Sequence, residues 1–394
     1  MNVYGTDQIR NVVVLGHGGS GKTTMVEAMA YVTGVTKRLG KVSDGTTISD
    51  FDKEEQKRHF SISTSVVPVE YDGIKINLLD TPGYFDFVGE AEEACSAAGA
   101  AIIVINGKSG VEVGTKKAWD LCEKYNLPRM FFVTNMDDDQ ASFRKIVMEL
   151  NDLYGRKVAP FHVPIRENEK FVGFVNVVKM KGRRFVGSTS EYEECEIPDY
   201  MDKHLTISRD SLIEAVAETS EEFMERYFSG EEFTYEEIST ALREHVMDNQ
   251  VVPVLVGSGV NAQGMSMLLM AIKKYFPSPL YRTVQGKEST TGEMVIVKYD
   301  ETKHFSSKVF KTMVDPFIGK YSLIKVVTGV LKAGDTVYNV NKEQEARAAK
   351  IYVMRGKEAI EVPELHAGDL GALTKIDNIS TGDTIAVKGA TLFY

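Results

Sequence analysis

The stretch Asn11-Val-Val-Val-Leu-Gly-His-Gly-Gly-Ser-Gly-Lys-Thr-Thr24 decides how this chain folds. It opens with an apolar, strand-forming run and is followed by a helix-forming run, Met25 to Tyr31. Residues 16–24 read GHGGSGKTT and match G-x-x-x-x-G-K-[ST], in which backbone N–H groups at a helix N-terminus converge on phosphate oxygens. Because a strand precedes the loop and a helix follows it, we interpret the loop as a phosphate cradle and not as an ordinary glycine-rich connection.

Specific roles follow for the residues of this cradle. We expect Lys22 to reach the outer phosphates of a bound nucleotide and Thr23 to offer its hydroxyl to Mg²⁺. Glycines at both ends of the loop set the turn. The expected nucleotide-binding residues are Gly16, His17, Gly18, Gly19, Ser20, Gly21, Lys22, Thr23 and Thr24.

A second motif, Asp80-Thr-Pro-Gly83, follows the apolar strand predicted over 74–79. An Asp-Gly turn at 72–73 pairs that strand with the preceding one. Asp80 is suited to hold a Mg²⁺-bound water, and Gly83 to offer its N–H to a γ-phosphate. Although an isolated D-x-x-G is usually only a turn, its position after a phosphate cradle favours a functional role.

Candidate base-reading residues lie at the ends of two later strands. After an expected strand over 101–105 and helix over 113–125, the strand 129–133 ends in Thr134-Asn135-Met136-Asp137. The Asp137 carboxylate is suited to accept from the paired N–H donors of a guanine edge, which adenine lacks. A one-residue shift would instead present Asn135 and Asp138, but it disturbs the alternation of the strand. The run 251–256 leads to Ser258, Gly259 and Val260, whose backbone is expected near the base carbonyl.

The order of these motifs resembles that of a translational GTPase, and the whole chain resembles elongation factor G. Five passages carry this resemblance and are together more specific than any short motif: 212–219, 253–260, 276–280, 315–319 and 365–372. The resemblance implies a doubly wound α/β G domain over 1–157, with P-loop, two switch regions and base-reading loop. It further implies an inserted α+β subdomain over 158–250, a return to the G domain over 251–280 and an antiparallel β-barrel over 281–394.

The function that this resemblance implies is GTP hydrolysis on the ribosome to drive translocation, with GTP, GDP and Mg²⁺ as ligands. The barrel is expected to meet small-subunit rRNA, for instance around Lys350, Arg355 and Lys357, and the insert to face the stalk proteins. One alternative is a hydrolytically impaired GTP-binding module that acts by occupying the ribosome. Another is a relative of the ribosomal-protection or release-factor type, because these proteins share the same domains.

The sequence departs from the family pattern at three places in the site. Tyr84 replaces the histidine that orients the attacking water, so we expect slow or atypical hydrolysis with Tyr84, Lys22 and Gly83 as the catalytic residues. Thr134 and Asn135 replace asparagine and lysine at the base. Gly18 and Gly19 replace an apolar residue and an aspartate. In the first switch region Ser61 keeps a hydroxyl, so the expected metal ligands are Thr23, Ser61 and Asp80.

Hydrophobic periodicity predicts the remaining elements. In the insert we expect two strands, 158–163 and 171–180, joined by a turn at 167–169, followed by helices over 207–227 and 234–247. A helix is expected over 265–275 and a proline-stiffened linker at 277–279. Short alternating runs of a β-barrel follow at 305–313, 321–328, 335–339 and 371–376.

Composition agrees with an ordinary globular chain. The 394 residues are 43% hydrophobic and 26% charged, and the three cysteines are too scattered for a disulfide framework or a zinc site. With no apparent signal or membrane-spanning run, we expect a cytoplasmic monomer with no membrane or DNA partner. The net charge of −10 is concentrated between Glu191 and Glu244, which hold 17 acidic and 4 basic residues. Family members continue into three further domains, so ending at Tyr394 suggests a natural truncation or part of a longer protein.

Overall fold

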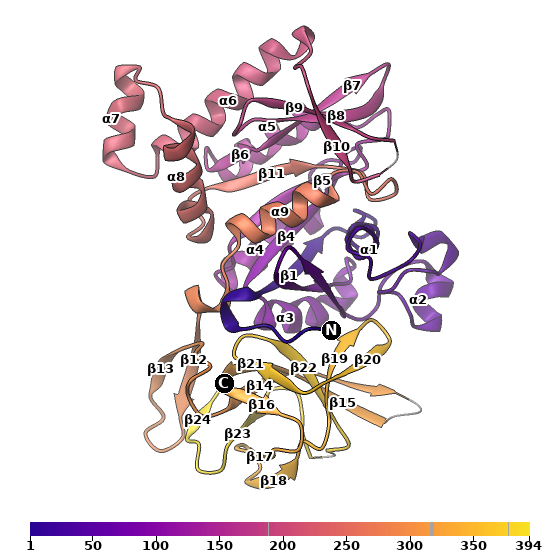
Figure 1. The fold of residues 1–394 in the computed structure, drawn as a ribbon, viewed down its shortest axis with the longest axis vertical. Helices are drawn as coiled ribbons and strands as arrows, with labels where there is room; N and C mark the ends of the chain where they lie inside the picture. The colour runs from indigo at the N-terminus through magenta and orange to yellow at the C-terminus, as the bar shows by residue number, and fades with distance from the viewer. Residues whose placement is uncertain (188, 316–318, 377) are drawn as a thin grey trace.

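The computed structural model describes residues 1–187, 189–315, 319–376 and 378–394, so the expected family passage at 315–319 lies largely outside the described residues. The first part is built on a seven-stranded sheet in the order β2-β3-β1-β4-β5-β11-β6 (Figure 1). Its strands are β1 (Ile9–Gly16), β2 (Ser65–Tyr71), β3 (Ile74–Asp80), β4 (Ala100–Asn106), β5 (Arg129–Thr134), β6 (Val158–Pro160) and β11 (Val252–Val256). Neighbours are parallel except β2 and β3, which form the expected hairpin.

Helices cover both faces of this sheet, which explains why its strands are almost continuously apolar and buried. These helices are α1 (Lys22–Val32), α3 (Val88–Ala97), α4 (Val113–Lys124), α5 (Phe143–Tyr154) and α9 (Met265–Tyr275). A short helix, α2 (Lys53–Arg58), lies in the long connection between α1 and β2. Single 3₁₀ turns occur at Thr6–Gln8, Val42–Asp44, Phe85–Phe87, Asp199–Met201 and Pro279–Tyr281. The order of strands and helices is that of the predicted doubly wound α/β domain.

The inserted segment forms a separate antiparallel sheet in the order β10-β9-β8-β7. Its elements are β7 (His162–Glu167), β8 (Lys170–Asn176), β9 (Lys181–Phe185), β10 (Tyr192–Cys195), α6 (Asp202–Ala217), α7 (Glu221–Ser229) and α8 (Tyr235–Met247). The turn predicted at 167–169 joins β7 to β8, where Asn168 and Glu169 adopt left-handed backbone angles. Helix α8 and the β7–β8 hairpin therefore agree with the sequence pattern.

Three predicted elements of the insert are wrong in detail. The strand expected over 158–163 is two strands, because β6 pairs with β11 in the main sheet and ends at Pro160, which has no N–H to extend a ladder. The strand expected over 171–180 turns after β8, and β9 begins at Lys181. The helix expected over 207–227 is two helices, because Ser220 caps a new one by accepting from the N–H of Phe223.

The C-terminal part consists of antiparallel sheets around a second apolar core. Its main sheet has the order β18-β17-β23-β14-β15-β22-β19-β20, beside a three-stranded sheet β13-β12-β24 and the pair β16-β21. The strands are β12 (Thr283–Glu288), β13 (Met294–Lys298), β14 (Ser306–Asp315), β15 (Gly319–Thr328), β16 (Val330–Lys332), β17 (Thr336–Asn339), β18 (Gln344–Arg347), β19 (Ile351–Arg355), β20 (Glu358–Val362), β21 (Glu364–His366), β22 (Leu370–Thr374), β23 (Thr384–Ala386) and β24 (Leu392–Phe393). The all-β character agrees with the prediction from alternating runs.

A buried polar network joins the two parts. Lys75 on β3 and Asp369, just before β22, form an ion pair of 2.8 Å with both side chains buried. Asn77 donates to the same carboxylate at 3.0 Å, and Asn11 donates to the carbonyl of Gly368 at 2.7 Å. Because removing one partner of a buried pair leaves an uncompensated charge, this network fixes the β domain against the base of the main sheet.

His162 gives the insert an acid-sensitive core. Its ring is buried against Phe174, with ring centroids 4.4 Å apart, and burial lowers the pKa of His162 to about 3. Above pH 6.5 the ring is neutral in both states, but below it the unfolded chain takes up a proton that the folded chain refuses. The free energy of unfolding therefore decreases as pH falls from 6.5 toward 3.

We expect His162→Phe to remove about 2 kcal/mol of this loss of stability at about pH 4.5, as measured by denaturant unfolding. If the stability of wild type and His162→Phe depended on pH in the same way, this prediction would be wrong.

Candidate nucleotide-binding site

The glycine loop between β1 and α1 has the shape of a phosphate cradle. Gly16 and Gly21 adopt positive φ angles of 144° and 95°, and a Cβ on Gly16 would lie 2.4 Å from the carbonyl oxygen of Val104. Lys22 is buried and donates to the carbonyls of Gly16 at 3.0 Å and His17 at 2.7 Å. Burial lowers the pKa of Lys22 to about 8. The loop therefore holds an ammonium group at its mouth, as a phosphate site requires.

Helix α4 packs directly on this loop, which sequence reasoning did not anticipate. The N–H of Gly114 donates to Nδ1 of His17 at 3.3 Å, while Nε2 of His17 faces the Glu112 carboxylate at 3.5 Å. A Cβ on Gly114 would lie 2.5 Å from Cα of His17. Only glycine allows this approach, so the start of α4 supports the back of the cradle.

Oxygen ligands gather beside Lys22. The hydroxyls of Thr23 and Ser61 lie 3.1 Å apart, and Ser61 donates to Asp50 at 2.7 Å. Among the residues that the structure describes, none makes a hydrogen bond of normal geometry to the two buried carboxylate oxygens of Asp80 or to one of the oxygens of Asp50. Burial, followed by repulsion from Asp50, raises the pKa of Asp80 to about 7, and burial also raises the pKa of Asp50.

Such a cluster fits a hard divalent cation. Mg²⁺ prefers oxygen ligands and keeps several waters, so hydroxyls and carboxylates around a small cavity are the appropriate donors. The orphaned oxygens of Asp80 are costly to bury unless a cation or its water shell completes them. The sequence pointed to Thr23, Ser61 and Asp80, but it missed Asp50, because an acidic residue in a long polar loop carries no motif.

Tyr84 and Phe60 close the outer side of the cradle. A Cβ on Gly18 would lie 3.0 Å from the Tyr84 ring, and Phe60 meets that ring edge-on with centroids 4.8 Å apart. Gly83 is equally restricted, because a Cβ there would lie 2.3 Å from Nζ of Lys22. The cavity that they border measures 240 Å³. The absence of a side chain at Gly18 is thus matched by the bulk of Tyr84.

The expected base-reading loop lies on the other side of the cradle. Thr134 donates to the carbonyl of Ser20 at 2.7 Å and so ties the two loops together. Asn135 adopts a left-handed φ of 55°. Among the residues that the structure describes, the exposed carboxylate of Asp137 has no hydrogen-bond or ion-pair partner. Asp138 is already engaged with the N–H of Gln140 at 2.9 Å and with Lys108 at 3.7 Å.

The loop after β11 completes this side. Gly257 accepts from the N–H of Met136 at 3.3 Å, which places the two loops side by side. Ser258 is fully buried, and its hydroxyl is without a partner in the described part of the chain. Gly259 packs closely on α1, because a Cβ there would lie 3.0 Å from the Thr24 methyl. The next residue, Val260, is 53% exposed. The predicted residues therefore surround one end of α1.

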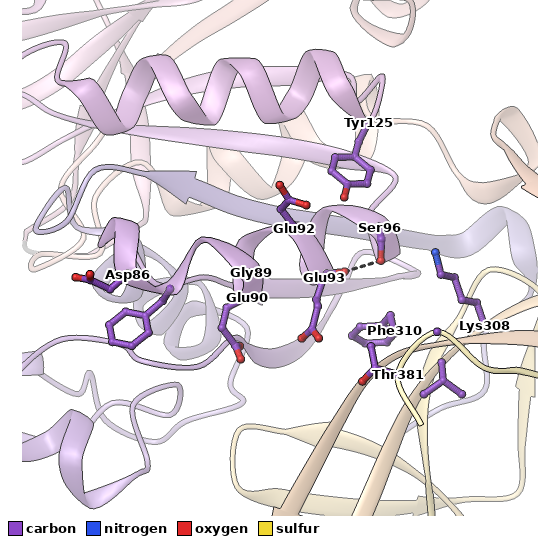
Figure 2. Close-up of a pocket in the computed structure, with 13 residues that line it drawn as sticks. Asp86, Gly89, Glu90, Glu92, Glu93, Ser96, Tyr125, Lys308, Phe310 and Thr381 are labelled. Atoms are coloured by element: carbon purple, nitrogen blue, oxygen red, sulfur yellow. Dashed lines mark hydrogen bonds between the residues drawn. The ribbon is translucent and has the colours of Figure 1, made fainter. Parts of the chain in front are cut away.

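A larger groove lies away from this cradle. Figure 2 shows it between the segment that begins α3 and the β domain, with a volume of 610 Å³. Glu90 and Glu93 project from α3, and Lys308 and Thr381 lie across from them. Lys311 forms an ion pair with Glu90 there. This groove has no glycine-rich loop and is not the phosphate site.

A glycine loop with a buried lysine, at the carboxyl edge of a parallel sheet, defines a P-loop nucleotide-binding protein. The family model for the elongation factor Tu GTP binding domain matches residues 7–278, and that for elongation factor G domain 2 matches 304–388. Elongation factor G of Thermotoga neapolitana is 36% identical over 381 residues, 96% of this chain and 55% of that protein. A crystal structure from Thermus thermophilus matches with a TM-score of 0.85 and 34% identity, over 98% of this chain and 55% of that one. The chain belongs to the family of elongation factor G-like translational GTPases.

The chain spans about half the length of these two relatives. Within the described residues, no helix is long and apolar enough to cross a membrane.

Proposed function

We propose that this chain is the GTP-binding and GTP-hydrolysing part of an elongation factor G-like protein that acts on the ribosome in translocation. The observation that carries the proposal is the cluster of Thr23, Ser61 and the orphaned Asp80 beside Lys22 at a P-loop. Its family membership supports the same activity. When bound there, Mg²⁺ would neutralise negative charge on the outer phosphates.

We assign the following roles in nucleotide binding and hydrolysis to residues of the chain. Lys22 exchanges its two carbonyl partners for phosphate oxygens, and the backbone N–H groups of the loop hold the remaining phosphate charge. Thr23 and Ser61 would hold the metal through their hydroxyls, Asp80 would orient a water beside it, and Gly83 would offer an N–H to the γ-phosphate. Asp50 would be a further acceptor for such a water. Hydrolysis then depends on positioning a water beside Tyr84.

Tyr84 makes the hydrolytic step slower than an imidazole would. A phenol orients water through one hydroxyl and, unlike an imidazole, does not take up a proton to become a cation. The Tyr84 side chain is 46% exposed and rests on Gly18 and Phe60, so its ring also excludes water from one side of the cradle. We infer binding and slow turnover, with acceleration on the ribosome.

The ribosomal contacts are inferred from family membership and charge. The acidic helices of the insert, α6 to α8, are assigned to the stalk proteins. The β domain is assigned to rRNA backbone, although Lys350 is paired with Glu361 at 2.7 Å and Arg355 lies 3.9 Å from Glu358. Lys357 is exposed in the same hairpin. Such contacts would be salt-sensitive and independent of sequence. We further infer a cytoplasmic monomer.

Nucleotides that differ in their base test whether Asp137 recognises guanine. Asp137→Asn removes a charged acceptor for two N–H donors, so GTP affinity should fall about 100-fold. Affinity for XTP, which presents an oxygen in place of the amino group, should rise. Fluorescent GTP, XTP and ATP titrations measure this, with Asp138→Asn as the matched control because Asp138 already has partners. Equal binding of ATP and GTP by the wild type would overturn the proposal.

A further inference from the structure

A hairpin of the inserted segment reaches the base-reading loop. Arg166, near the end of β7, donates from Nη1 to the carbonyl of Met136 at 3.0 Å and from Nη2 to the carbonyl of Asp138 at 2.8 Å. These two carbonyls stand on either side of Asp137. One guanidinium therefore spans the residue assigned to read the base.

The local structure aims Arg166 at this loop. The pairing of β7 with β8 shifts register between Ile165 and Arg166, and such a bulge redirects the following side chain. Arg166 is anchored in turn, because its carbonyl accepts from the Tyr200 hydroxyl at 2.8 Å. Its neighbour Glu167 pairs with Arg184 within the insert. The hairpin is thus held by contacts within the insert, while the Arg166 side chain extends toward the base-reading loop.

The charge of Arg166 has no acidic partner in the described ranges of the chain. Its donors go instead to main-chain carbonyls, those of Met136, Asp138 and Glu169. The planar fork of arginine suits such a bridge, whereas a lysine ammonium on a flexible stem does not reproduce it. An ordinary surface arginine would be solvated or paired with a carboxylate.

The loop that Arg166 spans needs support. Asn135 has a left-handed backbone, and Asp137 itself is exposed and without a partner among described residues. The N–H of Met136 is held by the carbonyl of Gly257 at 3.3 Å. The carbonyls of Met136 and Asp138 are held by Arg166. Removing it leaves the carboxylate of Asp137 free to move away from the base.

We propose that Arg166 is a positioning residue for guanine recognition, through which the inserted subdomain holds the base-reading loop. This inference rests on the proposed role of Asp137. Arg166 touches main-chain atoms and not the base, so its loss should change nucleotide discrimination through Asp137. The phosphate and metal side of the site should be unaffected, because it is held by α1 and β3.

The test compares Arg166→Ala and Arg166→Lys with Arg243→Ala, which removes an exposed arginine from helix α8 of the same insert. GDP and IDP are used as probes, because inosine lacks the amino group that a guanine reader contacts. Arg166→Ala should raise the dissociation rate of fluorescent GDP about 10-fold and lower the GDP-to-IDP affinity ratio several-fold. Arg166→Lys should give values between those of wild type and Arg166→Ala, and Arg243→Ala should match wild type. Thermal unfolding and the effect of Mg²⁺ on affinity should stay unchanged.

The outcomes separate the two assignments. A wild type that binds GDP and IDP equally overturns the role of Asp137 and this inference with it. If the wild type prefers GDP and Arg166→Ala keeps the same ratio, the inference alone is overturned. A fall in affinity that is equal for GDP and IDP, or equal in Arg243→Ala, also overturns it, because a general loosening of the insert would produce that result.

Discussion

Asp80→Asn is expected to change nucleotide binding and stability in opposite directions. The metal-dependent part of GTP affinity should fall at least about 100-fold, because a neutral amide does not hold the cation or its water. The unliganded chain should become more stable by about 1–3 kcal/mol at about pH 8. The reason is that burial raises the pKa of Asp80 to about 7, so the folded chain prefers an uncharged group at this position.

The sign of this stability change follows from linkage. The unfolded carboxyl ionises near pH ~4, whereas the folded one holds its proton to higher pH, so ionisation between these values weakens the wild-type fold. The variant lacks this loss and should gain most above about pH 7. Denaturant unfolding without ligand, and GDP titration with and without Mg²⁺, measure the two effects. Asp152→Asn is the control, since Asp152 is exposed on α5 and is not one of the site residues. A destabilised variant that retains metal-dependent binding would contradict the assignment.

Gly18→Val should lower GTP affinity about 10-fold or more, because its side chain needs the space of the Tyr84 ring. The first added carbon alone would lie 3.0 Å from that ring. Displacing Tyr84 also removes its contact with Phe60 and opens the cradle to water. Combining Gly18→Val with Tyr84→His should recover much of the affinity, since the smaller ring leaves room. The double mutant should lose less than the sum of the single changes.

Gly89→Ala is the matched control for this cycle, because a Cβ there meets nothing within 4 Å. Phosphate release in the presence of ribosomes gives the second readout. Tyr84→His should raise it, because an imidazole positions and exchanges protons near neutral pH. Strictly additive affinity changes would show that Gly18 and Tyr84 are independent, and unchanged turnover in Tyr84→His would remove Tyr84 from the hydrolytic step.

Elements with a strong periodic or motif signal were predictable. The strand, glycine loop and helix from Asn11 to Tyr31, and the hairpin before Asp80, carry local signals that need no tertiary contact. The strand expected over 158–163 failed because its apolar pattern is the same whether it stays in one sheet or passes between two. The break before Ser220 was missed because a capping hydroxyl inside an amphipathic run is a weak signal.

Within the site, the predicted phosphate and metal residues are those that belong to contiguous motifs. Thr23, Ser61 and Asp80 come from three separate segments, and the structure brings their side chains together beside Lys22. Asp50 and Arg166 escaped prediction. The roles proposed for them depend on where a long loop and a distant hairpin lie in the folded chain. The sequence around each residue does not indicate that position.

The amino-acid sequence by itself determined the class of fold and the chemistry of the cradle, because strand, loop and helix signals act over a few residues. Only the tertiary structure decided that Tyr84 fills the space left at Gly18 and that Arg166 spans the carbonyls beside Asp137. These contacts join residues that are far apart in the chain. Packing density and the direction of a bulged strand set them, and both are properties of the folded chain as a whole.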